Sequence, residues 1–280
     1  EGYFAAARRI TEEAGALLIA DEIQSGLART GDLLALDQPG ADPSTPVLGF
    51  VFLVALAVVF VILVIVNAVN WVDGLDGLAA GMVAIASASF FFYAYQQASA
   101  SGDRVFSTSA FISAATVGAC VGFLPHNFHP ARLFMGDAGS LLLGTLIAAA
   151  TISFAGNLDP AAVSGSGDAS VAFLLPLLVP LAILAVPLWD FAAAIVRRLR
   201  SGQKPWEADG RHLHHRMLKI GHTHRAAVLI LYLWSIGIAL GLVSMAYWPV
   251  ERSLAALTGL TVLAFALTWG LPRWRRRKAL

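Results

Sequence analysis

The sequence has few charged residues and almost no cysteine. Only 13% of its 280 residues are Asp, Glu, Lys or Arg, whereas 58% are hydrophobic. An ordinary soluble domain contains about a quarter charged residues, so this composition argues against a soluble protein and indicates a membrane protein. The single cysteine, Cys120, has no partner in the chain, which excludes a disulfide framework within it.

Long gaps separate the few charged residues. Seven uncharged runs follow one another, and each can hold the roughly 20 apolar residues with which a helix crosses a membrane. We therefore predict an all-α integral membrane protein with about seven transmembrane helices, preceded by a short fragment of the α/β-enzyme type. The runs are Thr45–Val72, Gly77–Gly102, Val105–Ala131, Ala138–Leu158, Ala169–Trp189, Ala226–Val250 and Ser253–Pro272.

The Lys and Arg residues are unevenly distributed between the two sides of the predicted membrane. Alternating the spans places Arg132, the segment Arg197–Arg225 and the tail Arg273–Lys278 on one side. Arg104 and Arg252 lie on the other. By the positive-inside rule the basic side is cytoplasmic. We expect a multi-pass protein of the cell membrane with a cytoplasmic C-terminus and a cytoplasmic active site.

A first polar cluster lies in "VNAVNWVDGLDGLAAG", residues 66 to 81. On a helix, Asn67, Asn70 and Asp73 would share one stripe, with Asp76 a further step along if the helix continued. A charge near the bilayer centre costs about 3 kcal/mol, so such a stripe indicates function. Two Asp-Gly turns at a helix end are the alternative, which leaves the two asparagines unexplained.

A second cluster, "HNFHPARLFMGDAGS" at 126 to 140, contains Asn127, Phe134 and Asp137. Asp137 precedes small residues that open the fourth predicted span, where it would either cap the helix or belong to a site. Phe134 is suited to stacking on a planar base, and a helix N-terminus favours anions.

The third cluster is "RHLHHRMLKIGHTHR" at 211 to 225, with His212, His214 and His215 between Arg211 and Arg216. Zinc is one interpretation, but the Cys or Glu companions of closed zinc sites are missing. A basic loop that grips a diphosphate, with Mg²⁺ on the carboxylates, fits better. All three clusters fall on the predicted cytoplasmic face, which is typical of an active site rather than of scattered helix caps.

The motifs "NAVNWVDGLDGLAAG", "FMGDAGS" and "HLHHR", in this order, resemble the polyprenyl-phosphate N-acetylhexosamine-1-phosphate transferases over about residues 47 to 280. "HLHHRM" is similar to the N-acetylglucosamine branch. The resemblance implies transfer of N-acetylglucosamine-1-phosphate from UDP-N-acetylglucosamine to a membrane polyprenyl phosphate, releasing UMP, in cell-envelope glycan assembly. It implies Mg²⁺, with Mn²⁺ as a substitute, and no nucleic-acid partner, and it leaves a homodimer open.

The same resemblance implies roles for individual residues. Asp137 would be the magnesium ligand, and Asp190 matches an acidic position of the family. The implied catalytic residues are Asp73, Asp76, Asp137, His212, His214 and His215. With the polar stripe and the basic loop added, the expected substrate-binding residues are Asn67, Asn70, Asn127, Phe134, Asp190, Arg211 and Arg216.

Residues 1 to 38 are of another kind, because they resemble a fragment of the class III pyridoxal-phosphate aminotransferases of the ornithine and acetylornithine type. The resemblance implies that Asp21 would pair with the pyridinium nitrogen of the cofactor and that Gln24 would lie beside its ring. The chain has no lysine before Lys204, so we expect no pyridoxal phosphate to bind. "PGADPSTP" at 39 to 46 reads as the junction of a chimeric or truncated gene.

The membrane domain, predicted at 47 to 280, departs from the family in one respect. The family carries an Asp-Asp pair in an early cytoplasmic loop, held to bind or deprotonate the acceptor phosphate, and this chain contains no Asp-Asp. We therefore expect a domain that lacks the family's first helices and is inactive by itself. The alternatives are a non-catalytic membrane remnant, or an aminotransferase if residues 1 to 38 define the protein.

Overall fold

The computed structural model describes residues 47–100, 107–156, 182–202, 204, 212–245 and 247–278, together with Arg9 and Glu13. The chain divides into two units, Glu1–Ala57 and Val58–Leu280. In the first unit, Arg9 and Glu13 are helical and exposed. Otherwise the expected aminotransferase-like fragment at 1–38 and the junction at 39–46 lie outside the described residues.

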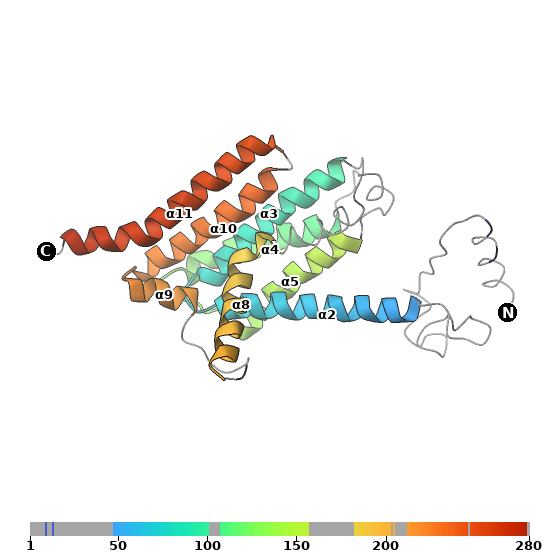
Figure 1. The fold of residues 1–280 in the computed structure, drawn as a ribbon, viewed down its shortest axis with the longest axis horizontal. Helices are drawn as coiled ribbons and strands as arrows, with labels where there is room; N and C mark the ends of the chain where they lie inside the picture. Colours follow the sequence, from blue (N-terminus) through green and yellow to red (C-terminus); the bar gives the residue numbers. More distant parts are fainter. Residues whose placement is uncertain are drawn as a thin grey trace. The chain divides into compact units, whose positions relative to one another are not determined.

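Every regular element in the described residues is a helix (Figure 1). The helices are α2 (Val47–Val72), α3 (Leu78–Ala100), α4 (Thr108–Asn127), α5 (Gly136–Gly156), α8 (Ala185–Arg200), α9 (Leu213–Ile220), α10 (His224–Ser244) and α11 (Val250–Lys278).

Six of these helices, α2, α3, α4, α5, α10 and α11, are long and apolar enough to cross a membrane. Each coincides with one of the predicted runs, so the prediction of an all-helical, multi-pass protein is confirmed for the described residues. Most of the predicted span Ala169–Trp189 lies outside them and stays a prediction. Large apolar side chains such as Phe60, Phe111 and Val262 are more than half exposed, as expected of surfaces that face lipid.

Small residues allow the helices to approach closely, as is usual in membranes. Helix α3 packs against α4 and α10, and α10 packs against α11. A Cβ atom on Gly81 of α3 would overlap the ring of Tyr232 on α10. A Cβ atom on Gly144 of α5 would lie only 2.7 Å from the Cα atom of Val66 on α2. At this crossing the two helices are therefore in contact through their backbones.

Several helices begin or end at the same end of the bundle. Helix α2 stops at Val72, and a turn leads to Leu78, with Gly77 in the left-handed region at φ +81°. The Gly77 N–H donates to the Asn127 side chain at 3.0 Å, which joins this turn to the end of α4. Because the helix does not continue past Val72, Asp76 does not extend a helical stripe, and the two Asp-Gly turns are real.

The contact between α2 and α5 can be tested by adding one methyl group. Gly144→Ala should lower the midpoint of thermal unfolding in detergent, because the Cβ atom would meet backbone that cannot rotate away, and overpacking costs about 1 to 3 kcal/mol. The matched control is Gly122→Ala in α4, where nothing lies within 4 Å. The control should be neutral or stabilising, because Ala favours helix over Gly. Equal midpoints for the two variants would contradict the close crossing.

Candidate active site

Asn70 connects the end of α2 to the start of α5. Its Nδ2 group donates to Asp137 Oδ1 at 3.2 Å and to Ser140 Oγ at 2.9 Å. Ser140 is fully buried one turn after Asp137, and its hydroxyl also donates to backbone carbonyls of that turn. The carboxylate of Asp137 is therefore held by a neutral donor from a segment far away in the sequence.

Asp73, in the turn after α2, lies among other acids. Burial raises its pKa from 3.8 to about 6, and the nearby carboxylates of Asp137 and Asp76 add to the rise. Repulsion of this kind is relieved when a cation enters. Mg²⁺ prefers one or two carboxylates together with phosphate oxygens, so the oxygen donors of Asp73 and Asp137 fit this ion.

The pKa of Asp76 is shifted in the opposite direction to that of Asp73. It accepts hydrogen bonds from His129 Nδ1 at 2.8 Å and from the Ala131 N–H at 3.2 Å. Burial alone would raise its pKa, but these two hydrogen bonds and the neighbouring imidazoles bring the pKa below 3.8. Asp76 is thus the carboxylate that stays charged, whereas Asp73 is the one that readily takes up a proton.

Asp190 links α8 to the histidine segment, the described part of the third cluster from His212 to His215. It is 3% exposed, and its two oxygens bond His212 Nδ1 at 3.0 Å and the Leu213 N–H at 2.9 Å. These bonds fix the first turn of α9 and keep a proton on His212 Nδ1, the nitrogen that faces the acid.

His214 lies directly against the aspartate turn. A Cβ atom on Gly74 would be 2.2 Å from His214 Nε2, so the absence of a side chain at Gly74 makes room for the ring. Burial, and then repulsion from His215, lower the pKa of His214 to about 4. The ring is therefore neutral near pH 7. It acts as a hydrogen-bonding group there, and Arg and Lys residues supply permanent positive charge in this segment.

Not every predicted site residue joins the cluster. Asn67 donates to the Leu63 carbonyl of its own helix at 2.8 Å. Both polar groups of Asn127 are used inside the fold, because its amide nitrogen donates to the Leu133 carbonyl and its oxygen accepts from Gly77. Phe134 is 74% exposed, free to meet a ligand. Arg216 is exposed on α9, and Arg211 lies outside the described residues.

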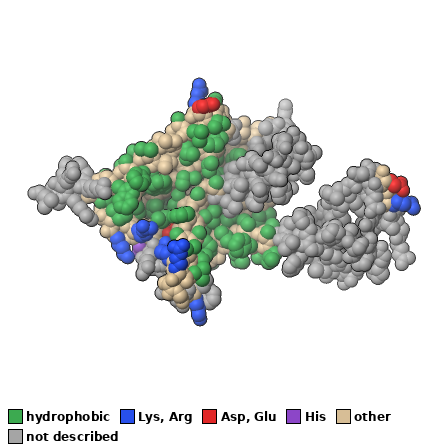
Figure 2. All heavy atoms as spheres, in the orientation of Figure 1, with side chains coloured by type: hydrophobic (Ala, Val, Ile, Leu, Met, Phe, Trp, Pro, Cys, Tyr) green, Lys and Arg blue, Asp and Glu red, His purple; other side chains and the backbone are tan. Residues whose placement is uncertain are grey.

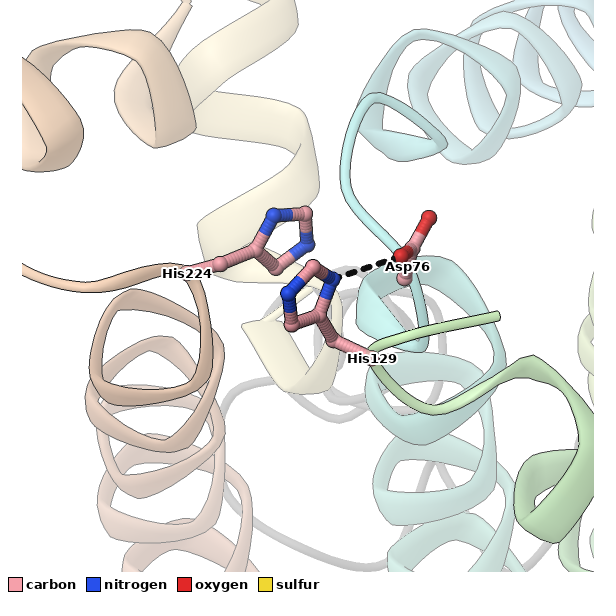
Figure 3. Close-up of side chains that lie close together, drawn as sticks. All are labelled: Asp76, His129 and His224. Atoms are coloured by element: carbon pink, nitrogen blue, oxygen red, sulfur yellow. Dashed lines mark hydrogen bonds and ion pairs between the residues drawn. The ribbon is translucent and has the colours of Figure 1, made fainter.

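Three residues of the site were missed by the sequence analysis. His129 and His224 stack with ring centroids 4.1 Å apart beside Asp76 (Figure 3). Arg225 donates from Nε to the His129 carbonyl at 3.0 Å. All three stand within the polar stretches singled out from the sequence, but nothing in the spacing pairs a loop after α4 with the start of α10.

Basic residues collect around α8 and α9 on the face shown in Figure 2. Glu251 and Arg252 lie at the start of α11. The described basic residues on the site side include Arg197, Arg198 and Arg200 in the last turn of α8. Trp71 of α2 lies under the Arg198 guanidinium at 4.2 Å and against Phe191 of α8 at 4.6 Å. In Figure 1, α8 crosses the direction of α2 at this point.

These features define a multi-pass helical membrane protein with carboxylate, amide and imidazole groups at one end of its helices. Residues 27–155 match the model of the glycosyl transferase family 4. Residues 1–49 match that of the class-III aminotransferases. Both resemblances stated from the motifs are thereby confirmed, and the two matched segments overlap between residues 27 and 49.

Curated relatives agree with the first match. The chain is 44% identical over 175 residues to a decaprenyl-phosphate N-acetylglucosaminephosphotransferase of Mycobacterium tuberculosis, which covers 62% of this chain and 43% of the relative. It is 37% identical over 133 residues, 48% of this chain and 33% of the relative, to a probable undecaprenyl-phosphate N-acetylglucosaminyl 1-phosphate transferase of Bacillus subtilis. The chain thus spans less than half the length of these relatives.

The crowding of Asp73 predicts a pH dependence of stability. Because the pKa of Asp73 is raised in the folded state, its protonated carboxyl stabilises the folded protein fully below about pH 4. This stabilisation is lost as the pH rises through about 6. Asp73→Asn keeps the side chain neutral throughout. The unfolding midpoint of the variant minus that of the wild type, measured in detergent without divalent ions, should therefore increase from about pH 4 to about pH 7.

Subtracting the wild-type midpoint also cancels the effect of His214, which is present in both proteins and changes stability with pH in the opposite direction. Its lowered pKa reduces stability as the pH falls from 6.5 towards 4. A difference that is constant over the range would show that neither burial nor the neighbouring acids raise the pKa of Asp73.

Proposed function

We propose that this chain carries the donor half of an enzyme that transfers N-acetylglucosamine-1-phosphate from UDP-N-acetylglucosamine to a membrane polyprenyl phosphate, releasing UMP. The observation that carries the proposal is that Asp73, Asp76 and Asp137 meet His214 at one end of the bundle, although they come from three distant segments. The names of the relatives supply the substrate class: a polyprenyl phosphate and an N-acetylglucosamine phosphate.

Asp137, with Asp73 beside it, is the proposed Mg²⁺ site. When bound there, the ion would offset the charge of the diphosphate oxygens. Asn70 keeps Asp137 oriented through its hydrogen bond. Asp76, charged and fixed by His129, is proposed to face the uracil together with the exposed ring of Phe134.

The histidine segment is proposed to lie over the phosphates. Asp190 orients the ring of His212 and holds a proton on its Nδ1. His214, neutral near pH 7, is suited to donate a hydrogen bond to a phosphate oxygen without adding charge. The positive charge for the diphosphate then comes from Arg211 and Arg216. Groups placed in advance around a reacting phosphate lower the barrier mainly by positioning and by their charge.

The acceptor side of the reaction is not proposed for this chain. The resemblance assigns the acceptor phosphate to an Asp-Asp pair, and the sequence contains none. We therefore expect this chain to bind the donor without turnover, so that binding is the proper quantity to measure.

Donor binding tests the proposal directly. The chain purified in detergent should bind UDP-N-acetylglucosamine in the presence of Mg²⁺, measured by isothermal titration calorimetry. Asp137→Asn should weaken binding at least tenfold, because a neutral amide preserves shape but loses the charge that holds Mg²⁺. The control variant Glu251→Gln removes an exposed acid in the first turn of α11, away from the site, and should bind UDP-N-acetylglucosamine as the wild type does.

Two results would contradict the proposal. One is equal affinity of the wild type and Asp137→Asn at ordinary Mg²⁺ concentrations. The other is UMP release above the Asp137→Asn blank when polyprenyl phosphate is added. The second would show that the acceptor group lies within this chain, with Asp190 the first residue to examine.

The orientation in the membrane is also proposed. The site lies at the end of the helices that carries the arginines of α8 and the basic residues of α9, and Arg252 lies at the opposite end. By the positive-inside rule this distribution of charge supports a cytoplasmic site in a protein of the cell membrane.

Single cysteines can verify this orientation in a chain whose Cys120 is replaced by Ala. Lys204→Cys should react with a membrane-impermeant maleimide only after the cells are opened, because Lys204 is exposed just beyond α8. Arg252→Cys, exposed at the start of α11, should react in intact cells. The reverse pattern would place the site outside the cell.

A further inference from the structure

The side chains of Asp76, His129 and His224 lie close together, although they come from three segments of the chain (Figure 3). They come from the turn before α3, the loop after α4 and the first residue of α10. Each offers one ligand atom, and these atoms all lie within 4.8 Å of one another. No other such group of three or more His, Cys, Asp or Glu side chains occurs in the described residues.

One nitrogen in this group lacks a hydrogen bond. His224 Nε2 is buried and has no hydrogen-bond partner of normal geometry among the described residues, although the backbone of Asp76 interacts with the His224 ring. In Figure 3 a ring nitrogen of His224 lies on the side that faces Asp76 and His129. Leaving a buried polar atom without a partner costs about 1 to 3 kcal/mol of stability. The arrangement therefore favours a metal ion, which would accept the lone pair of this nitrogen.

The backbone around the three side chains is held in place. The Arg225 guanidinium donates to the His129 carbonyl at 3.0 Å, and the Ala131 N–H donates to Asp76 at 3.2 Å. Coordination requires the side chains to rotate, because the rings of His129 and His224 are stacked and nearly parallel, at 13°, and their lone pairs do not yet point at one ion. His129 Nδ1 and Asp76 Oδ2 lie 2.8 Å apart, whereas ligands of a tetrahedral ion with bonds of about 2.0 to 2.1 Å are separated by roughly 3.3 Å.

The donor set selects the kind of ion. Two imidazole nitrogens and one carboxylate oxygen, completed by water, suit zinc and related transition metals. Mg²⁺ takes oxygen ligands and is bound poorly by imidazole. Asp73 and Asp137, by contrast, offer only oxygen. The two groups of side chains therefore differ in the chemistry of the ion they accept, although they lie in one region.

We propose that Asp76, His129 and His224 form a binding site for a divalent transition metal ion of the zinc type, separate from the Mg²⁺ site at Asp137. Binding would replace the proton shared by His129 and Asp76, supply the missing partner of His224 Nε2 and cross-link three segments. The proposal does not require the transfer reaction, because it concerns a different ion and ligands other than Asp73 and Asp137. Asp76 is the one residue that it shares with the proposed donor site.

The test uses Co²⁺ as a spectroscopic substitute for zinc. The whole chain, purified in detergent without a histidine tag, is titrated with Co²⁺ while the visible d–d absorption of the four-coordinate ion is recorded. We expect a saturable signal at one ion per chain, abolished by an equivalent of Zn²⁺ and unaffected by a large excess of Mg²⁺.

Variants assign the signal to its ligands. His224→Ala and His129→Ala should each abolish it, and His224→Gln should do so while preserving side-chain size and polarity if the alanine variant fails to fold. His126→Ala is the matched control, since that histidine is exposed three residues before His129 and lies outside the group. The signal should persist in this control and also in Asp137→Asn.

Three outcomes would overturn the proposal. They are the absence of a saturable Co²⁺ signal, its persistence in the folded His129 and His224 variants, and its loss in His214→Ala or His215→Ala but not in His224→Gln. The last would place a metal on the segment of α9 instead. If Asp137→Asn removed the signal, the two ions would share one site.

Discussion

The hydrogen bonds that Asn70 and Asn127 make at the ends of apolar helices hold the rest of this site in place. Asn70 ties α2 to Asp137 and Ser140 at the start of α5. Asn127 ties α4 to the turn at Gly77. Near a membrane few water molecules can satisfy such groups, so amides that lose their partners are costly. The neutral amides therefore bring carboxylates together without adding charge of their own.

The carboxylates brought together in this way acquire different properties. Asp73 has a pKa raised by burial and by the acids near it, whereas hydrogen bonds from an imidazole and a backbone N–H lower the pKa of Asp76. Opposite shifts in neighbouring acids are a common way to divide roles within a site. Here the division separates an oxygen-only environment suited to Mg²⁺ from a mixed nitrogen and oxygen environment beside it.

The spans and the polar clusters were predictable because their signals are local. A run of apolar residues reports a membrane helix whatever it packs against, and six such helices coincide with predicted runs. The predicted run Thr45–Val72 ends where α2 ends, but the course of the chain beyond Val72 was left open, since Asp73 and Asp76 continue the helical spacing of Asn67 and Asn70. In the structure a turn follows Val72 and includes Gly77, which takes a left-handed conformation and whose N–H donates to the Asn127 side chain.

The sequence by itself determined the helical membrane class and the residue types available for chemistry, because apolar length and motif content are properties of a segment. Only the tertiary structure decided which of these residues meet. It stacked His129 on His224 beside Asp76, placed His214 over Gly74 and buried Asp190 under His212. These pairings depend on how helices cross, and crossings are set by small residues such as Gly144 whose packing partners lie far away in the chain.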